Sequence, residues 1–380
     1  MRLRALLGLV AVHGQSAHDL VAGSDFVFSS KIGFPAAATL DAATATLCFA
    51  DINNGNSGTC THLTLTGTEF SKGSDLVFKA SPSQQISVAA MSSTASIVCY
   101  NDFANGGYVT CNYLALTGTD FSKGDDLVVF DDTLYVNYGQ TASRCSVTAL
   151  DATSALLCWS GLYYAVGETD SDASFFTVCN HLTLSGTTLS KGADLLFEEM
   201  TFTPFTTTLS STEAIVCYEA NTAVGAGCNH LTVSGTTLSK GAKVNLAAVS
   251  TAVAYEISVS AIGTSSIIVC FDHRDFAVVG SEQGICNTIT VTGSTLTLGT
   301  ALVFNDGDTS QLSVSPFGAS TEAVVCYKDN ANSNYGTCNH LVSSGGTLSK
   351  GGDLVVNDAS TAAFRGSVVA LGAGAAACYK

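Results

Sequence analysis

The sequence has little charge, little proline and a single tryptophan. Charged residues make up 12% of the 380 positions, and Pro occurs 4 times. With 46% hydrophobic residues the chain has ample material for a core, which excludes an intrinsically disordered protein. Basic residues are scarce as well, because 15 Lys and Arg stand against 31 Asp and Glu, for a formal net charge of −16. This balance argues against nucleic acid or an anionic membrane surface as the main partner.

Familiar catalytic and metal-binding motifs are also lacking. The chain has no HExxH, P-loop, GxSxG elbow or Rossmann fingerprint. It has no clustered CxxC or CxxH pairs of the kind that bind zinc, and no apolar run long enough to span a membrane. The sequence therefore assigns no catalytic residue and no cofactor, and it favours a protein that is not an enzyme. Paired carboxylates of a glycosidase leave no such signature and stay open.

The chain does contain an internal repeat of about 52–59 residues. In each copy an apolar run ends in Cys plus an aromatic residue, a second Cys follows a Gly/Asn-rich gap, and a turn of the type Gly-Thr-x-Leu/Phe-Ser-Lys-Gly comes next. Residues 86–91, 95–100, 110–116 and 125–130 illustrate the four strand-like segments of one copy. Short strands bounded by Gly, Asn and Ser turns are typical of one blade of a β-propeller.

We therefore predict an all-β fold, a seven-bladed β-propeller of four-stranded antiparallel blades. The first and second strands recur seven times, and residues 25–28 supply a fourth strand before any second strand appears. The N-terminal strand is then expected to join the C-terminal strands and close the ring. The third strand recurs six times, so the closing blade is short of a strand, or residues 8–18 fill in, or the sequence is truncated at Lys380.

The cysteines predict disulfides within the repeats. Fourteen Cys at a repeated spacing are typical of a disulfide framework made in an oxidising compartment, with free thiols as the alternative. Each bridge would contribute about 2–4 kcal/mol. Cys145 and Cys378 are left without partners. The predicted pairs are Cys48–Cys60, Cys99–Cys111, Cys158–Cys179, Cys217–Cys228, Cys270–Cys286 and Cys326–Cys338.

The N-terminus is consistent with export. A basic start at residues 1–4 precedes a short apolar segment at 5–12, and Ser16 and Ala17 offer small residues for cleavage. We predict a signal peptide at residues 1–17 and a single propeller domain at 18–380, placed outside the cell or on its surface. The alternative for residues 1–17 is an extra outer strand.

Three recurring side chains are interpreted as structural. The aromatic residues after the first Cys are expected to fill the space between adjacent blades. The Asn before His or its equivalent (Asn112, Asn180, Asn229, Asn287 and Asn339) is expected to hydrogen-bond the backbone. A recurring His could suggest a metal, but equivalent positions on different blades lie too far apart to share an ion. These histidines are His62, His181, His230 and His340.

Two loops resemble calcium sites faintly. Residues 51–56 and 329–334 each combine one carboxylate, Asp51 or Asp329, with several Asn. Calcium takes six to eight oxygens, so either loop would bind it weakly. Asn and Gly are also what tight turns require, and turn formation is the favoured interpretation.

The repeat resembles a loosely defined family of β-propeller repeats found in large extracellular or surface proteins. The strings that carry the resemblance are Val-Cys-Tyr-Lys-Asp-Asn-Ala-Asn-Ser-Asn-Tyr-Gly-Thr at 325–337 and Ser-Gly-Thr-Thr-Leu-Ser-Lys-Gly at 234–241. The resemblance covers nearly all of residues 20–380 and implies a propeller fold and an extracellular setting. It implies no activity or site.

The third and fifth repeats depart most from the pattern, in the loop between the second and third strands. Variable loops on a rigid scaffold commonly carry binding. We predict a secreted binding or adhesion module that recognises a glycan or a surface protein through these loops. The alternatives are a hydrolase or lyase with an axial carboxylate pocket, and a purely structural matrix protein. The predicted contacts are Tyr163, Tyr164, Asp170, Asp172, His273 and Asp275.

Overall fold

The computed structural model confirms the all-β class. It describes residues 9–11, 20–22, 26, 31–67, 69–129, 144–163, 174–199, 201–220, 225–246, 252–275, 282–317, 321–357, 368–372 and 374–377. Over these ranges the chain forms antiparallel strands joined by turns and two 3-10 turns, Ile52–Asn54 and Phe103–Asn105, and it contains no α-helix. None of the described residues forms a helix with the length and hydrophobicity of a membrane span.

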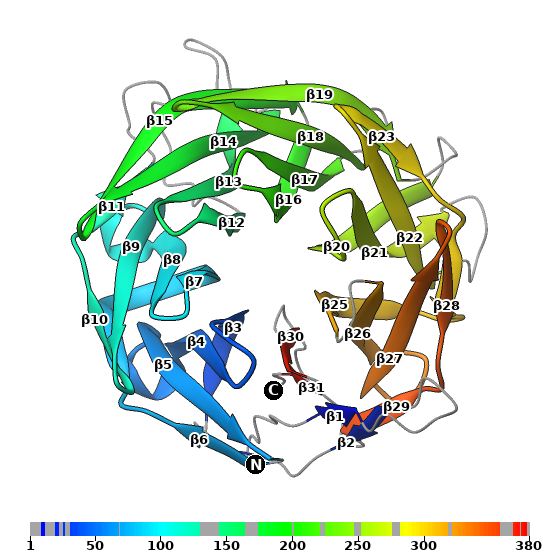
Figure 1. Cartoon of the computed structure of the whole chain (residues 1–380), viewed down its shortest axis with the longest axis horizontal. Coiled ribbons are helices and arrows are strands. Elements are labelled where there is room, and N and C mark those ends of the chain that lie inside the picture. Colours follow the sequence, from blue (N-terminus) through cyan, green and yellow to red (C-terminus); the bar gives the residue numbers. More distant parts are fainter. Residues whose placement is uncertain are drawn as a thin grey trace.

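The sheets stand around a central axis, with the first strand of each nearest the axis and the last strands at the periphery (Figure 1). Two sheets consist of four strands in chain order. The first contains β12 (Arg144–Asp151), β13 (Ser154–Tyr163), β14 (Ser174–Ser185) and β15 (Thr188–Glu199). The second contains β16 (Thr201–Ser210), β17 (Glu213–Ala220), β18 (Gly227–Ser234) and β19 (Thr237–Asn245).

In the next two sheets the outer strand is divided into two short pieces that both pair with the third strand. One sheet contains β20 (Ala252–Ala261), β21 (Ser266–Asp275), β22 (Gln283–Thr292), β23 (Thr295–Leu298) and β24 (Leu302–Asn305). The other contains β25 (Thr309–Pro316), β26 (Glu322–Asp329), β27 (Tyr335–Ser344), β28 (Thr347–Lys350) and β29 (Leu354–Asn357).

A nine-stranded sheet joins two such units through one long strand. The start of β7 (Leu76–Ser92) pairs with β5, and its end pairs with β8. The same strand is therefore the outer strand of one unit and the inner strand of the next. The other strands are β3 (Ile32–Thr39), β4 (Thr44–Asp51), β5 (Ser57–Thr66), β6 (Glu69–Lys72), β8 (Ala95–Asp102), β9 (Tyr108–Thr117), β10 (Asp120–Lys123) and β11 (Leu127–Val128).

The two ends of the chain share a sheet. It contains β30 (Val368–Leu371), β31 (Gly374–Ala377), β1 (Leu9–Ala11) and β2 (Leu20–Ala22), in the order β2-β1-β31-β30. Strand β1 pairs antiparallel with β31 through Leu9 and Ala375. Strand β1 lies inside the segment predicted as a signal peptide, which stays a prediction.

The six predicted disulfides are all present. Each joins residues directly opposite each other on the second and third strands of a unit, as Cys99 opposes Cys111 in the β8–β9 ladder. The paired Cα atoms are 4.0–4.1 Å apart. Cys145 is a free, buried cysteine, and Cys378 lies outside the described residues.

The aromatic residue after the first Cys packs between units, as predicted. In three places an aromatic of the outer strand of one unit contacts the second-strand aromatic of the next. The ring centroids are 4.9 Å apart for Phe78 and Tyr100, 5.6 Å apart for Phe197 and Tyr218, and 4.9 Å apart for Phe304 and Tyr327. All of these rings are buried.

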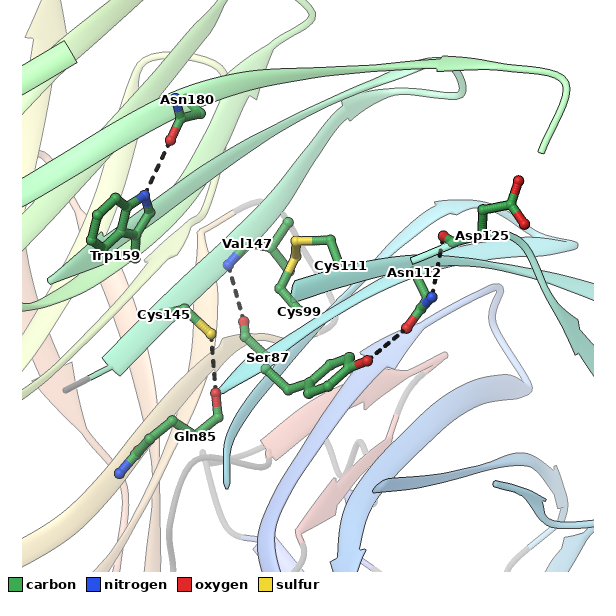
Figure 2. Close-up of a disulfide and its surroundings, with 11 residues drawn as sticks. Gln85, Ser87, Cys99, Cys111, Asn112, Asp125, Cys145, Val147, Trp159 and Asn180 are labelled. Atoms are coloured by element: carbon green, nitrogen blue, oxygen red, sulfur yellow. Dashed lines mark hydrogen bonds between the residues drawn. A yellow bond between two sulfur atoms is a disulfide. The ribbon is translucent and has the colours of Figure 1, made fainter. Parts of the chain in front are cut away.

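The recurring Asn connects that aromatic residue to the outer turn. Tyr100 donates its hydroxyl to Oδ1 of Asn112 at 3.1 Å, and Trp159 donates its indole N–H to Asn180 at 3.1 Å (Figure 2). The Asn112 amide donates in turn to the Asp125 carbonyl, as Figure 2 shows, and the Asn180 amide donates to Asp194. The predicted backbone hydrogen bond of the Asn is thus confirmed at Asn112, and it recurs at Asn229, Asn287 and Asn339.

The Ser-Lys-Gly turn has a packing role that the sequence did not reveal. A Cβ added to Gly192 would meet the carbonyl oxygen of Thr236, which lies in the equivalent turn of the next sheet. The same relation joins Gly124 to Thr187, and Gly241 to Ser294. Each turn therefore rests against the Gly of the turn before it, which explains why this motif varies so little along the chain.

Replacing Gly192 by Ala is expected to destabilise the protein by about 1–3 kcal/mol, because the added methyl group meets backbone that cannot rotate away. Gly263 is the control, since neither glycine has a left-handed φ and a Cβ at Gly263 would have nothing within 4 Å. Urea unfolding measures both variants. Equal midpoints for G192A and G263A would contradict this role of the outer turns.

Candidate functional site

A cavity of about 270 Å³ lies on the axis, between the first strands of the units. Its wall is built from equivalent positions of β3, β7, β12, β16, β20 and β25, all of which border the axis in Figure 1. The wall therefore combines residues from all along the chain, and side chains that are far apart in sequence meet there.

Five first strands share a bulge near the start of the ladder with their second strand: β3, β7, β16, β20 and β25. Strand β12 pairs without a shift from Arg144 to Ala149. The ladder between first and second strand skips residues at this point, between Gln84 and Ser87 for example, and between Tyr255 and Ser258. The first residue skipped in each strand has a positive φ, a conformation that costs a non-glycine residue about 1–3 kcal/mol. The five such residues are Phe34 at 50°, Gln85 at 50°, Thr203 at 51°, Glu256 at 49° and Gln311 at 54°. A bulge redirects side chains, and four of these five line the cavity.

Serine hydroxyls hold neighbouring first strands together just beyond the bulges. The Val147 N–H donates to Ser87 Oγ at 3.0 Å (Figure 2), and the Val314 N–H donates to Ser258 Oγ at the same distance. The Thr206 N–H donates to Ser146 Oγ at 3.0 Å. These small serine side chains thus fit beside the axis and also bond the next strand.

Charged side chains gather at one part of the cavity wall. Arg144 of β12 and Glu256 of β20 both line it, with Arg144 Nη2 4.0 Å from Glu256 Oε1. Their side chains are 26% and 30% exposed, so water or a ligand can reach both. Phe34, Gln85 and Gln311 line the cavity as well. We call the part of the cavity that these three residues form with Arg144 and Glu256 the mouth.

Glu219, at the end of β17, lies beside this pair. Its Oε1 accepts a hydrogen bond of 2.8 Å from the Glu256 N–H, and the residue is 8% exposed. Burial raises the pKa of the Glu219 carboxyl to about 7, with the nearby Arg144 lowering it and Glu256 raising it further. A carboxyl group that holds its proton near neutral pH can act as a hydrogen-bond donor or as an acid.

A second carboxyl group is buried at the equivalent place in the next sheet. Asp272 of β21 accepts a 2.6 Å hydrogen bond from Arg274 Nε, and Arg274 Nη2 also reaches Asp308 at 3.4 Å. Burial raises the pKa of Asp272 to about 6, although Arg274 opposes this and Asp308 and Glu256 add to it. The carboxyl groups of Glu219, Glu256, Asp272 and Asp308 therefore interact across three sheets.

This mouth opens on the face from which the loops between second and third strands leave. The start of each first strand pairs with the end of the second, as Ala252 pairs with Asp275. The bulges, Glu219 and Asp272 consequently lie at the same end of their sheets as the loops predicted to bind.

The predicted contact residues are placed only in part. His273 and Asp275 lie at the end of β21, and Tyr163 ends β13. Tyr164, Asp170 and Asp172 lie outside the described residues. The structure thus leaves a binding role for these six a prediction. Arg144, Glu219 and Glu256 were missed, although Arg144 and Glu256 both stand two residues before a first-strand Ser.

The four recurring histidines lie on separate sheets, each beside its own acidic residue. His340 Nε2 is 3.2 Å from Glu322, and His230 Nε2 is 3.5 Å from Glu213. Burial lowers the pKa of His62, His181 and His230, while an Asp or Glu nearby raises it. The arrangement fits the structural interpretation. No three His, Cys, Asp or Glu side chains are grouped to hold a metal ion in the ranges that the structure covers.

The two loops considered for calcium use their carboxylates in turns. Asp51 Oδ1 accepts from the Asn53 N–H at 3.0 Å, and Asp329 Oδ1 accepts from the Asn332 N–H at 3.2 Å. These bonds are those of turn-forming Asp residues. A weak calcium affinity of either loop stays a prediction.

Comparisons with known proteins indicate the fold of the chain and do not indicate its function. No family model matches the chain, and no curated protein sequence does. A protein of known crystal structure from Lactobacillus plantarum is 14% identical with a TM-score of 0.54, over 94% of this chain and 98% of its own. A 6-phosphogluconolactonase-like protein from Bacteroides fragilis is 8% identical with a TM-score of 0.54, over 94% and 96%. A hypothetical selenium-binding protein from Sulfolobus tokodaii is 8% identical with a TM-score of 0.53, over 82% and 76%. The fold is accordingly β-propeller-like.

Cys145, which lines the cavity, is expected to be unreactive in the folded protein. Its thiol lies 3.1 Å from the Gln85 carbonyl oxygen (Figure 2), and burial raises its pKa to about 12. The thiolate is the reactive form. Iodoacetamide at pH 8 should therefore leave Cys145 unmodified in native protein and modify it in urea, as read by peptide mass spectrometry. Rapid modification of the native protein would contradict this placement.

Glu219 is expected to make stability fall as the pH rises. Its pKa is about 7 when folded against 4.5 as the ordinary value, so the native state keeps a proton that the unfolded state has lost. Stability from this group is present below pH 4.5 and declines through pH 7, by at most about 3 kcal/mol. E219Q keeps an acceptor oxygen and should show a smaller decline between pH 5 and 8 in urea unfolding, whereas E69Q, in exposed β6, should behave as wild type. Identical pH profiles for E219Q and wild type would overturn the assignment.

Proposed function

We propose that the chain is a secreted, closed seven-bladed propeller that binds one sugar residue of a glycan at the axial mouth. The double role of β7 divides the nine-stranded sheet into two units, and the four separate sheets and the terminal sheet supply the rest. Six disulfides are consistent with an extracellular setting. Cleavage after residue 17 belongs to the same proposal, and it would remove β1 from the terminal sheet.

The observation that carries the binding proposal is the set of side chains that the first strands bring to one cavity. Phe34 supplies an aromatic face, Gln85 and Gln311 supply amides, and Arg144 and Glu256 supply a charged donor and acceptor. A flat apolar surface ringed by hydrogen-bonding groups of both kinds suits a sugar ring, which has apolar C–H faces and hydroxyl edges. Since the volume is about 270 Å³, one sugar residue fits and the rest of a glycan would extend toward the loops.

Phe34→Ala is expected to weaken glycan binding by roughly tenfold, through the loss of buried aromatic contact of about 1–2 kcal/mol. Leu196→Ala is the control, because Leu196 is 55% exposed on the outer strand β15 and does not line the cavity. A glycan array identifies the ligand and calorimetry measures both variants. A variant that lacks residues 162–174 distinguishes a site in the axial cavity from a site on this loop. If the deletion abolishes binding and F34A binds fully, the site lies on the loop and the axial site is rejected.

A hydrolase is the second candidate, and the raised pKa of Glu219 beside Glu256 is the observation that favours it. Glycosidases pair a protonated carboxyl group with an ionised one, and Glu219 with a pKa near 7 is suited to the acid role. Release of nitrophenol from a panel of aryl glycosides, lost in E219Q, would support this function. No release by wild-type protein that binds the same sugars would leave binding as the function.

A further inference from the structure

The charges around the axial mouth are unbalanced. Four carboxyl groups, those of Glu219, Glu256, Asp272 and Asp308, interact there with only two guanidinium groups among the described residues, those of Arg144 and Arg274. Arg274 is engaged on both sides, with Asp272 at 2.6 Å and Asp308 at 3.4 Å. Arg144 is left to neutralise both Glu219 and Glu256.

Glu256 is the carboxylate that a ligand in the cavity can contact. It lines the wall and is 30% exposed, and its ion pair with Arg144 is long, at 4.0 Å, against about 2.7–2.9 Å for a charge-assisted hydrogen bond. Its backbone is fixed, because its N–H donates to Glu219 and its φ is 49°. The side chain is therefore held at the mouth, and its carboxylate oxygens can accept further hydrogen bonds.

A buried oxygen nearby also lacks a donor. Asp272 is 0% exposed, and its Oδ1 has no hydrogen-bond partner within the described part of the chain. Its charge interacts unfavourably with those of Glu256 and Asp308. An unpaired buried carboxylate oxygen is costly. One more positive charge beside Glu256, the one of the four carboxyl groups that lines the cavity, would therefore stabilise the group.

We infer that the ligand of the axial cavity carries a protonated amine, and that Glu256 receives this ammonium group while Phe34 and the wall hold the sugar ring. The inference rests on the proposed glycan binding and specifies an amino sugar as the ligand class. Phe34, which lines the cavity, would contact the carbon skeleton, and a bare metal ion would not use this apolar surface. The ammonium group takes the Glu256 oxygen that Arg144 leaves incompletely bonded.

Calorimetry at pH 7.0 with glucosamine, glucose and ethylammonium tests the inference on the full chain. Glucosamine should bind about tenfold more tightly than glucose, as expected for one charge-assisted hydrogen bond. E256Q should lose this preference and bind both sugars equally, while E69Q, an equivalent change on the exposed strand β6, should keep it.

The outcomes separate this inference from the proposed function. Equal binding of glucose and glucosamine by wild-type protein would overturn the amine and leave the glycan site standing. Binding of ethylammonium without either sugar would support the amine and overturn the glycan. Unchanged preference in E256Q overturns the assignment to Glu256, and a fold check by urea unfolding shows whether that variant is native. Displacement of glucosamine by millimolar calcium chloride would also count against it, since the carboxylates would then form a metal site.

Discussion

A backbone N–H that donates to a serine hydroxyl of the preceding first strand sets the geometry of the axis. Ser87, Ser146 and Ser258 each accept such a bond from the neighbouring strand at 3.0 Å. The first strands therefore keep one height relative to each other, and their bulges come to lie in a ring. Without this alignment, Arg144 and Glu256, which are separated by a whole sheet, would not face the same cavity.

A second series of contacts joins neighbouring sheets at the periphery, where the turn of one sheet rests on the Gly of the Ser-Lys-Gly motif in the preceding sheet. These contacts explain why the Ser-Lys-Gly turn varies so little and why four of six first strands carry Ser at one position, Ser87, Ser146, Ser258 and Ser313. Both are contacts between copies, and no single copy could satisfy them. The disulfide and the Asn bonds act within each copy, so the fold divides its stabilisation between modules and their junctions. Positions outside these contacts are left to vary, and the bulge position is one of them.

The sequence was sufficient for the all-β class, the six disulfides and the packing of Tyr100, Tyr218 and Tyr327, because each depends on spacing within one copy and on strand period. It was insufficient for the site. Arg144, Glu219 and Glu256 belong to three different copies, and their proximity follows from the arrangement of the sheets about the axis, which leaves no local pattern in the sequence. The role of Gly192 escaped for the same reason, since its partner Thr236 lies in another copy. Tyr163 and His273 were noticed because they interrupt the repeat. An interruption shows where the sequence departs from the pattern but not which side chains come together in space.

The site arises from equivalent positions of five first strands, which carry different residues: Phe34, Gln85, Arg144, Glu256 and Gln311. Together they present an aromatic ring, two amides and two opposite charges to one small volume. The most direct test is a crystal structure of the protein with glucosamine. Electron density for the sugar is expected on the axis, between Phe34 and Glu256. Density beside His273 and Asp275, at the end of β21, with an empty axis would contradict this site.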